Sequence, residues 1–403
     1  MTLKYGSFST PDDVARHPFT SNPDVVARRS YVTPPDEVVR RTVELAEVPA
    51  PTGLEAARHE RVRTWWLDDG WADVHPDEVG NLWARVRPGE GPAVVICAHL
   101  DTVFDDTVDH RVRRDGTLLR GPGVGDDSVG VAALSAVGAL LAGAPGAAPV
   151  WIVATVGEEG LGNLLGIGEV IRQDRVPLAA VVAIEGNYLG RVATVGVGSV
   201  RWRVTVTGPG GHAWEQASAP SAVHAAAQMV AALAALPAVS PARFRGAAEA
   251  PPSLVARSSV ARSSVQAAPR PSSSLMAGTA VNVGVFSGGE AVNARARQAV
   301  FLADLRATGA AALADLEERA RRVVRAPGAE ITVAIEELGR RPAGELAQTH
   351  PLARAAADAL NAAGLPAVFT AASTEANAAH AAGVPAVAIG VTSGAGEHTP
   401  GEW

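Results

Sequence analysis

Apolar strands alternate with helical segments over the first half of the chain, and this alternation limits the fold to a sheet covered by helices. Short runs rich in β-branched residues, such as 93–98 and 150–156, are separated by segments with helical spacing, such as 129–141. The pattern therefore predicts an α/β fold with a mostly parallel sheet flanked by helices. The expected elements are helices 35–45, 54–69, 129–141 and 164–174 and strands 82–86, 93–98, 150–156 and 179–184.

The pattern changes after Gly198, where a second set of strands and helices begins. Its members follow in the order β-α-β-β-α-β, which is typical of a ferredoxin-like α+β domain. The rhythm of the first half then resumes with helix 351–363 and strand 386–390. We therefore expect a smaller domain, 198–341, inserted into a larger one that consists of 1–197 and 342–403. The expected elements of the insertion are strands 200–207, 279–286, 299–306 and 331–337 and helices 217–236 and 310–324.

The composition is that of a globular protein with more than one core. The 403 residues exceed the roughly 250–300 over which a single core grows, and 47% of them are hydrophobic and 19% charged. The net charge is -7 and no basic run occurs, so we expect no nucleic-acid partner. Segment 247–274 is rich in Pro, Ser and Ala and repeats Ala256–Val260 as Ala261–Val265. We expect a flexible loop there, without a role in chemistry.

One uncharged stretch, 128–157, is long enough to cross a bilayer, but Pro145 and Pro149 interrupt it. It predicts a buried helix followed by a buried strand, and we expect no membrane association. Residues 1–23 lack the apolar core of a secretory signal, and the single cysteine, Cys97, can form no internal disulfide. These features predict a cytoplasmic protein.

Polar side chains follow three of the expected parallel strands at their carboxyl ends. His99 comes directly after strand 93–98, with Asp101 two residues on, and the pair Glu158 and Glu159 follows strand 150–156 between glycines. Glu185 follows strand 179–184. Because ligands bind beyond the carboxyl ends of such strands, these side chains can share one site. A turn or a helix cap explains His99 and Asp101 equally well, although Asp101 could also accept the second imidazole N–H of a metal-bound His99.

Two further positions add candidate ligands. Asp126 and Asp127 follow a glycine-rich turn at the start of helix 129–141, where one carboxylate can cap the helix while the other bridges two cations. His398 lies in a loop of small residues after the last expected strand, although a lone loop histidine is usually just solvated. Imidazoles and carboxylates together suit Zn²⁺ and tolerate Co²⁺ or Mn²⁺.

These motifs, in this order, resemble those of the di-zinc exopeptidase superfamily, which includes aminoacylase, glutamate carboxypeptidase and peptidase T. The resemblance extends from about Val38 to the C-terminus, apart from the repeat loop. It implies two zinc ions and Glu158 as the general base. Asp127 is preferred to Asp126 as the bridging ligand because it stands three residues before Gly130, as in the family's Asp-x-x-Gly pattern. The implied metal ligands are His99, Asp127, Glu159, Glu185 and His398.

The insertion resembles the family's lid and dimerisation domain, which implies a homodimer formed through it. Its segment Gly208–Ala213 matches the loop whose histidine reaches an active site, often across a dimer, so the resemblance implies that His212 stabilises the oxyanion. Asn282, Asn293 and Arg306 fall in stretches that resemble the substrate-facing part of that domain. The usual Ile-Pro does not follow Asn293.

The resemblance implies hydrolysis of amide bonds in small peptides or N-acyl amino acids, by water that bridges two zinc ions. An alternative is a metal-binding regulatory or interaction protein of the same fold that has lost catalysis. Ser128 and Val129 favour the alternative, because they replace a lysine-containing turn that is common after the bridging Asp. The presence of Glu158 favours the enzyme.

Overall fold

The computed structural model describes residues 35–237, 278–325 and 328–403. The repeat loop expected at 247–274 and the N-terminal segment 1–23 lie outside these residues. The chain divides into two compact units. Unit 1 consists of Met1–Val197 and Gly339–Trp403, and unit 2 of Gly198–Leu338.

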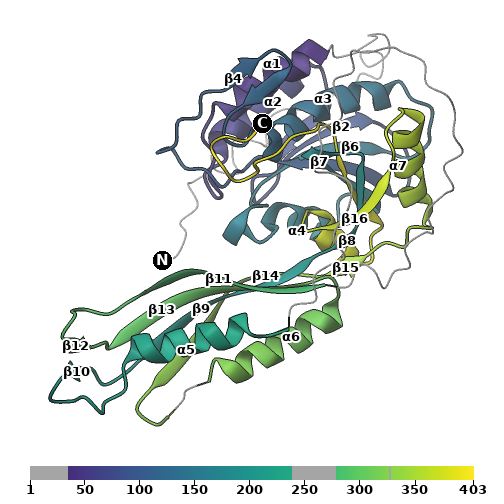
Figure 1. The fold of residues 1–403 in the computed structure, drawn as a ribbon. Helices are drawn as coiled ribbons and strands as arrows, with labels where there is room; N and C mark the ends of the chain where they lie inside the picture. The colour runs from purple at the N-terminus through teal and green to yellow at the C-terminus, as the bar shows by residue number, and fades with distance from the viewer. Residues whose placement is uncertain (1–34, 238–277, 326–327) are drawn as a thin grey trace, which may run out of the picture. The chain divides into compact units, whose positions relative to one another are not determined.

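A nine-stranded sheet forms the centre of unit 1 (Figure 1). Its four central strands are parallel, and antiparallel pairs extend it on both sides. Parallel central strands place their carboxyl ends at one edge of the sheet, where the candidate ligands lie. In spatial order the strands are β1 (Ala72–Pro76), β2 (Leu82–Arg87), β6 (Val150–Thr155), β3 (Ala93–His99), β7 (Leu178–Leu189), β17 (Ala386–Gly390), β8 (Arg191–Gly196) and β15 (Gly344–Glu345), with β16 (Val368–Ala372) beside β8.

Helices cover both faces of this sheet because its central strands are apolar on both sides. In β3, Ile96 and Ala98 face one core while Val95 and Cys97 face the other. The first core also contains residues of α1 (Pro35–Ala46), α2 (Ala56–Asp68) and α3 (Val129–Ala142). The second contains residues of α4 (Leu165–Arg172) and α8 (Ala376–Ala381), while α7 (Pro351–Ala362) packs on β8 and β17. A short hairpin, β4 (Arg113–Asp115) and β5 (Leu118–Arg120), completes unit 1.

The apolar segment Val124–Ala142, which includes α3, is the one helical stretch among the described residues that is long and apolar enough to cross a membrane by length and composition. In its most apolar window 67% of the residues are buried. Such burial is what a core helix of unit 1 requires.

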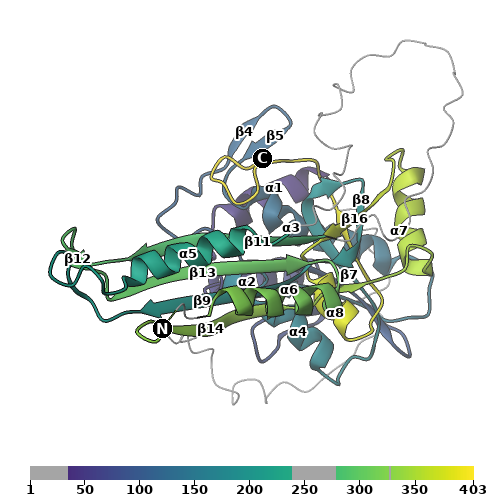
Figure 2. The ribbon, with the colours of Figure 1, turned by 60° about the horizontal axis from the view of Figure 1, so that its bottom comes forward.

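Unit 2 consists of a four-stranded sheet with two helices on one face, which Figure 2 shows in front of the strands. Alternate residues of β13 are buried, as expected for a sheet with one covered face. The strand order β11-β13-β9-β14, with one helix after β9 and one after β13, is ferredoxin-like. The elements are β9 (Gly198–Thr207), α5 (Ala222–Ala234), β11 (Thr279–Gly288), β13 (Gln298–Ala307), α6 (Ala310–Val323) and β14 (Thr332–Arg341), with a small pair β10 (Gly211–His212) and β12 (Ala294–Arg295). The last residues of β14, from Gly339 on, belong to unit 1.

The fold class predicted from the sequence is confirmed, with local differences. The helix expected at 217–236 begins only at Ala222, because Pro220 disfavours helical backbone before it. The strand expected to end at Ile184 continues to Leu189, so Glu185 lies within β7. Several short elements were not predicted, among them β8, β16 and α8, since small and polar residues interrupt their apolar pattern.

Leu305 and Leu302 provide a matched test of the core of unit 2. Both lie on β13, where Leu305 is fully buried and Leu302 is half-buried on the other face. Leu305→Ala should lower the free energy of unfolding by about 2–5 kcal/mol, because it leaves a cavity in the core. Leu302→Ala should cost clearly less. Urea unfolding of the full chain, followed by circular dichroism, measures both, and equal losses would contradict the assigned core face.

Candidate metal centre

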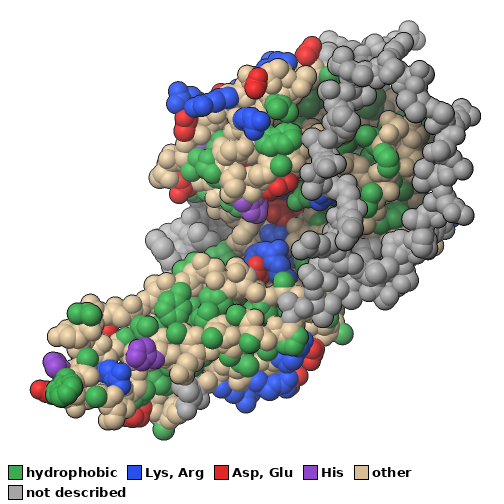
Figure 3. Space-filling view, in the orientation of Figure 1, with side chains coloured by type: hydrophobic (Ala, Val, Ile, Leu, Met, Phe, Trp, Pro, Cys, Tyr) green, Lys and Arg blue, Asp and Glu red, His purple; other side chains and the backbone are tan. Residues whose placement is uncertain are grey.

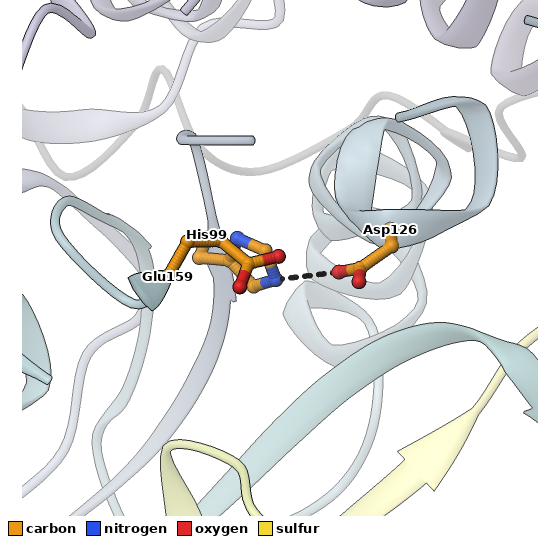
Figure 4. A group of neighbouring side chains, drawn as sticks. All are labelled: His99, Asp126 and Glu159. Atoms are coloured by element: carbon orange, nitrogen blue, oxygen red, sulfur yellow. Dashed lines mark hydrogen bonds and ion pairs between the residues drawn. The ribbon is translucent and has the colours of Figure 1, made fainter. Parts of the chain in front are cut away.

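Histidine and acidic side chains from four separate segments of unit 1 meet at the carboxyl ends of its strands. Figure 3 shows histidine and acidic side chains side by side on the surface. One ligand atom each of His99, Asp126 and Glu159 lie within 4.8 Å of one another (Figure 4). His398 joins them, because its Nε2 is 3.2 Å from Asp126 Oδ2 and 3.3 Å from Glu159 Oε1. These contacts raise the pKa of His398 to about 10, although partial burial opposes the shift.

The orientation of His99 is fixed from both sides. This residue ends β3 and is 1% exposed. Its Nδ1 is 3.0 Å from the main-chain oxygen of Asp101, which can only accept, so Nδ1 carries a proton. Nε2 therefore faces the group, 3.0 Å from Asp126 Oδ1. Burial would lower the pKa of His99, but the Asp101 and Asp126 carboxylates outweigh it and raise the pKa well above its ordinary value.

Of the two adjacent aspartates, the structure places Asp126, and not Asp127, in this group. Asp126 presents one carboxylate oxygen to His99 and the other to His398. Asp127 is fully buried and turned away, with Oδ2 accepting from the N–H of His99 at 3.3 Å and Oδ1 from the N–H of Gly130 at 3.2 Å. The spacing to Gly130 that favoured Asp127 reflects a hydrogen bond at the start of α3.

The Asp101 carboxylate lies near His99, as expected, but its short hydrogen bonds go to other partners. Its Oδ1 is 3.6 Å from His99 Nδ1, farther than the Asp101 carbonyl oxygen. The two carboxylate oxygens instead accept hydrogen bonds from the main-chain N–H groups of Glu158 at 3.0 Å and Glu159 at 2.9 Å, and Thr52 Oγ1 adds a third at 2.8 Å. Asp101 therefore fixes the turn that carries both glutamates.

Glu158 is buried beside the group and pairs with a basic side chain, Arg341, that the sequence analysis missed. Arg341 Nη1 donates to Glu158 Oε1 at 2.9 Å, and Nη2 donates to the main-chain oxygen of Glu158. Both side chains are almost fully buried. Burial raises the pKa of Glu158 to about 7, with Arg341 opposing the shift and Glu159 adding to it. A carboxyl group with this pKa can take up and release a proton near neutral pH.

Glu185 is buried in β7 but lies outside the three-residue group. Burial and the neighbouring Asp127 carboxylate raise its pKa well above the ordinary value, and Asp126 adds to the effect. Nearby positive charge would stabilise this buried acid as an anion.

The four candidate residues of unit 2 form two local groups. His212 and Asn293 are neighbours, since β10 pairs with β12 and the N–H of Ala213 donates to Asn293 O at 2.9 Å. Asn282 lies on β11 opposite Asp304 of β13, and Asp304 Oδ2 accepts from Arg306 Nε at 2.8 Å. The guanidinium of Arg306 is therefore already paired.

The donor atoms of unit 1 fit a divalent cation. They are imidazole nitrogens and carboxylate oxygens, the mixture that zinc and similar metals accept, and Cys97 lies apart in the second core. Buried carboxylates outnumber the nearby basic groups, which makes the site costly without added positive charge. The pairs that His99 and His398 form with Asp126 compensate only part of this negative charge.

The sequence analysis also missed two acids that hold main-chain N–H groups. Glu55 accepts from Gly53 at 2.8 Å and from Gly157, next to Glu158, at 3.2 Å. Glu402 accepts from the turn that carries Asp126. No local pattern marks either residue, because Gly157 and the turn of Asp126 are distant from them in sequence.

Two family models match separate parts of the chain. Residues 197–332 match the family model of the peptidase dimerisation domain, and residues 81–189 match that of peptidase family M28. No curated protein matches the sequence.

Solved structures match nearly the whole chain at low sequence identity. Aminopeptidase PepT from Bacillus cereus has a TM-score of 0.65 and 18% identity, over 91% of this chain and 92% of that chain. YxeP of Bacillus subtilis, a dinuclear metal-binding peptidase of the M20 family, has a TM-score of 0.60 and 14% identity over 91% and 92%. A hydantoinase/carbamoylase family amidase from Burkholderia ambifaria has a TM-score of 0.54 and 20% identity over 89% and 90%. The two family-model matches, together with the fold shared with M20 peptidase structures, support the zinc exopeptidase superfamily for this chain.

Proposed function

We propose that the protein is a metal-dependent hydrolase that cleaves amide bonds of small peptides or N-acyl amino acids. The observation that carries the proposal is the convergence of His99, Asp126, Glu159 and His398 beside the buried carboxyl group of Glu158. This combination provides both cation ligands and a group for proton transfer.

We assign the ligands to two zinc ions, with Co²⁺ or Mn²⁺ as substitutes. Asp126 is the proposed bridge, in place of Asp127, because each of its oxygens faces a different histidine. Glu159 and His398 would complete one site, and His99 with Glu185 the other. Bound cations would lower the pKa of a water molecule and polarise the substrate carbonyl.

Glu158 is the proposed general base. Its buried carboxyl group can accept a proton from water, hold it, and deliver it to the leaving nitrogen. Arg341 holds the carboxylate in place through Nη1 and fixes the main chain through Nη2. We therefore regard Arg341 as a residue that positions Glu158.

Residues of unit 2 are assigned as the resemblance implies. His212 Nδ1 accepts from the main-chain N–H groups of Trp214 at 3.3 Å and Glu215 at 3.4 Å, so a neutral His212 carries its proton on Nε2. That N–H suits donation to an oxyanion. Asn282, Asn293 and Arg306 remain proposed substrate-binding residues. We also propose a homodimer formed through unit 2, which matches the peptidase dimerisation domain, and a cytoplasmic location.

The similar structures support the substrate class only in broad terms, since they include an aminopeptidase and a hydantoinase/carbamoylase family amidase. The decisive experiment is a metal analysis of the purified protein, followed by assays on dipeptides, tripeptides and N-acyl amino acids. Hydrolysis that a chelator abolishes and added Zn²⁺ or Co²⁺ restores would support the enzyme. Bound metal without hydrolysis across the panel favours the alternative, a metal-binding regulatory or interaction protein.

The two adjacent aspartates should differ sharply in their effect on metal content. Asp126→Ala removes the contacts to both histidines, so we expect the bound metal to fall by at least one equivalent. Asp127→Asn keeps an oxygen that can accept main-chain N–H groups, so metal content should be retained with some loss of stability. Elemental analysis after equilibrium dialysis measures both. The opposite ranking would return the bridging role to Asp127.

The two adjacent glutamates provide the corresponding test of catalysis. Glu158→Gln should keep the metal and lower kcat by about 10²–10⁴-fold, because it removes the proton acceptor. Glu159→Gln should instead lower metal content, because it weakens a ligand. Steady-state assays and elemental analysis of the same preparations separate the two effects. Undiminished turnover by Glu158→Gln would exclude it as the base.

A further inference from the structure

Glu402 is a buried carboxylate to which the proposed reaction assigns no role. The residue is fully buried, and its carboxylate accepts from the main-chain N–H groups of Gly123 at 3.0 Å, Gly125 at 3.0 Å and Asp126 at 2.7 Å. Asn187 Nδ2 donates a fourth hydrogen bond at 3.1 Å. Burying a charge in this way is costly, and these hydrogen bonds offset part of the cost.

Two glycines leave the main-chain N–H groups of this turn uncovered by side chains. Gly123 has a φ of 65°, which favours glycine, and a Cβ on Gly125 would lie 2.2 Å from Asn187 Oδ1. Main-chain N–H groups that converge in this way form an anion-binding concavity. An acidic side chain from a distant segment fills it.

The same residue also fastens the loop that carries His398. The N–H of Glu402 donates to the main-chain oxygen of Thr399 at 3.1 Å, and Thr399 directly follows His398. The main-chain oxygen of Glu402 accepts from the N–H of Gly121 at 2.9 Å. Side chain and main chain of Glu402 thus join the loop of His398 to the turn of Asp126.

We propose that Glu402 is a positioning residue that sets the separation of Asp126 and His398, and through it the metal affinity of the site they share with Glu159. The inference rests on the ligand roles proposed above. His398 depends on such support because its side chain is 56% exposed and lies on a loop, where few packing contacts hold it. The loss of groups that orient ligands typically weakens metal binding 10–100-fold.

Glu402→Gln tests this inference. Glutamine has nearly the same shape, but it loses the charge and turns an NH₂ group towards N–H donors. We expect Co²⁺ titrated into the metal-free full-length variant to bind about 10–100-fold more weakly than in the wild type. The visible absorption spectrum of bound Co²⁺ should also change, because the spectrum reports ligand geometry. Wild-type affinity and spectrum in the variant would overturn the inference, whereas a wild-type protein that binds no Co²⁺ would overturn the proposed function instead.

Asp77 provides a matched control. Its Oδ1 also accepts three main-chain N–H groups, from Val79 at 3.1 Å, Gly80 at 3.1 Å and Asn81 at 2.9 Å, in a turn without metal ligands. Asp77→Asn should lower the stability of the protein and leave Co²⁺ affinity and spectrum unchanged. An equal loss of Co²⁺ affinity in this control would mean that general destabilisation suffices, which would overturn the inference.

Glu402→Asp serves as the second variant, and it carries the test if Glu402→Gln does not fold. Aspartate keeps the charge, but its shorter side chain cannot reach all the N–H groups that Glu402 bonds. We expect a loss of Co²⁺ affinity smaller than that of Glu402→Gln. Wild-type affinity in Glu402→Asp would also overturn the inference.

Discussion

The candidate metal centre depends on one kind of interaction, the hydrogen bond from a main-chain N–H group to a buried carboxylate. Asp101 holds the turn 158–159, Asp127 holds the end of β3, and Glu402 holds the turn before α3. Each of these three segments carries a ligand. Because a buried N–H group without a partner costs about 1–3 kcal/mol, these acceptors favour the observed turns independently of any ion. The ligands are therefore positioned by acids that do not belong to the ligand group themselves.

This construction concentrates negative charge, and Arg58 accounts for part of its compensation. Arg58 is fully buried on α2, and its Nη1 donates to the main-chain oxygen of Leu100, which lies between His99 and Asp101. Burial lowers the pKa of Arg58 to about 10, while the carboxylates of Asp101, Asp127 and Glu402 oppose the shift. The charged guanidinium of Arg58 therefore compensates part of the negative charge of the supporting acids Asp101, Asp127 and Glu402. The acids of the ligand group require cations of their own.

The sequence predicts where the site lies better than it predicts which atoms face it. Apolar runs identify β3 and β6, and the polar residues after them must then meet at one edge of the sheet. Spacing cannot choose between Asp126 and Asp127, because local backbone dihedrals decide which of two neighbouring side chains turns inward. Arg341 and Glu402 could not be found at all, since nothing near them in sequence reveals their partners in other segments. Hydrogen bonds between segments far apart in the chain produce no repeating pattern in the sequence.

Unit 1 tolerates an inserted unit because the chain leaves and re-enters it at neighbouring points. Asn377 is fully buried, and its Nδ2 donates to the main-chain oxygens of Val197 and Pro342, both at 2.9 Å. Val197 directly precedes unit 2 and Pro342 lies in the segment Gly339–Trp403 that follows it, so one side chain joins the two ends of unit 1. The segment after it then supplies Arg341 and His398 to a site that the first segment begins. Glu158 and His99 lie in the first segment and Arg341 and His398 in the second, so these side chains come together only once the two segments have assembled.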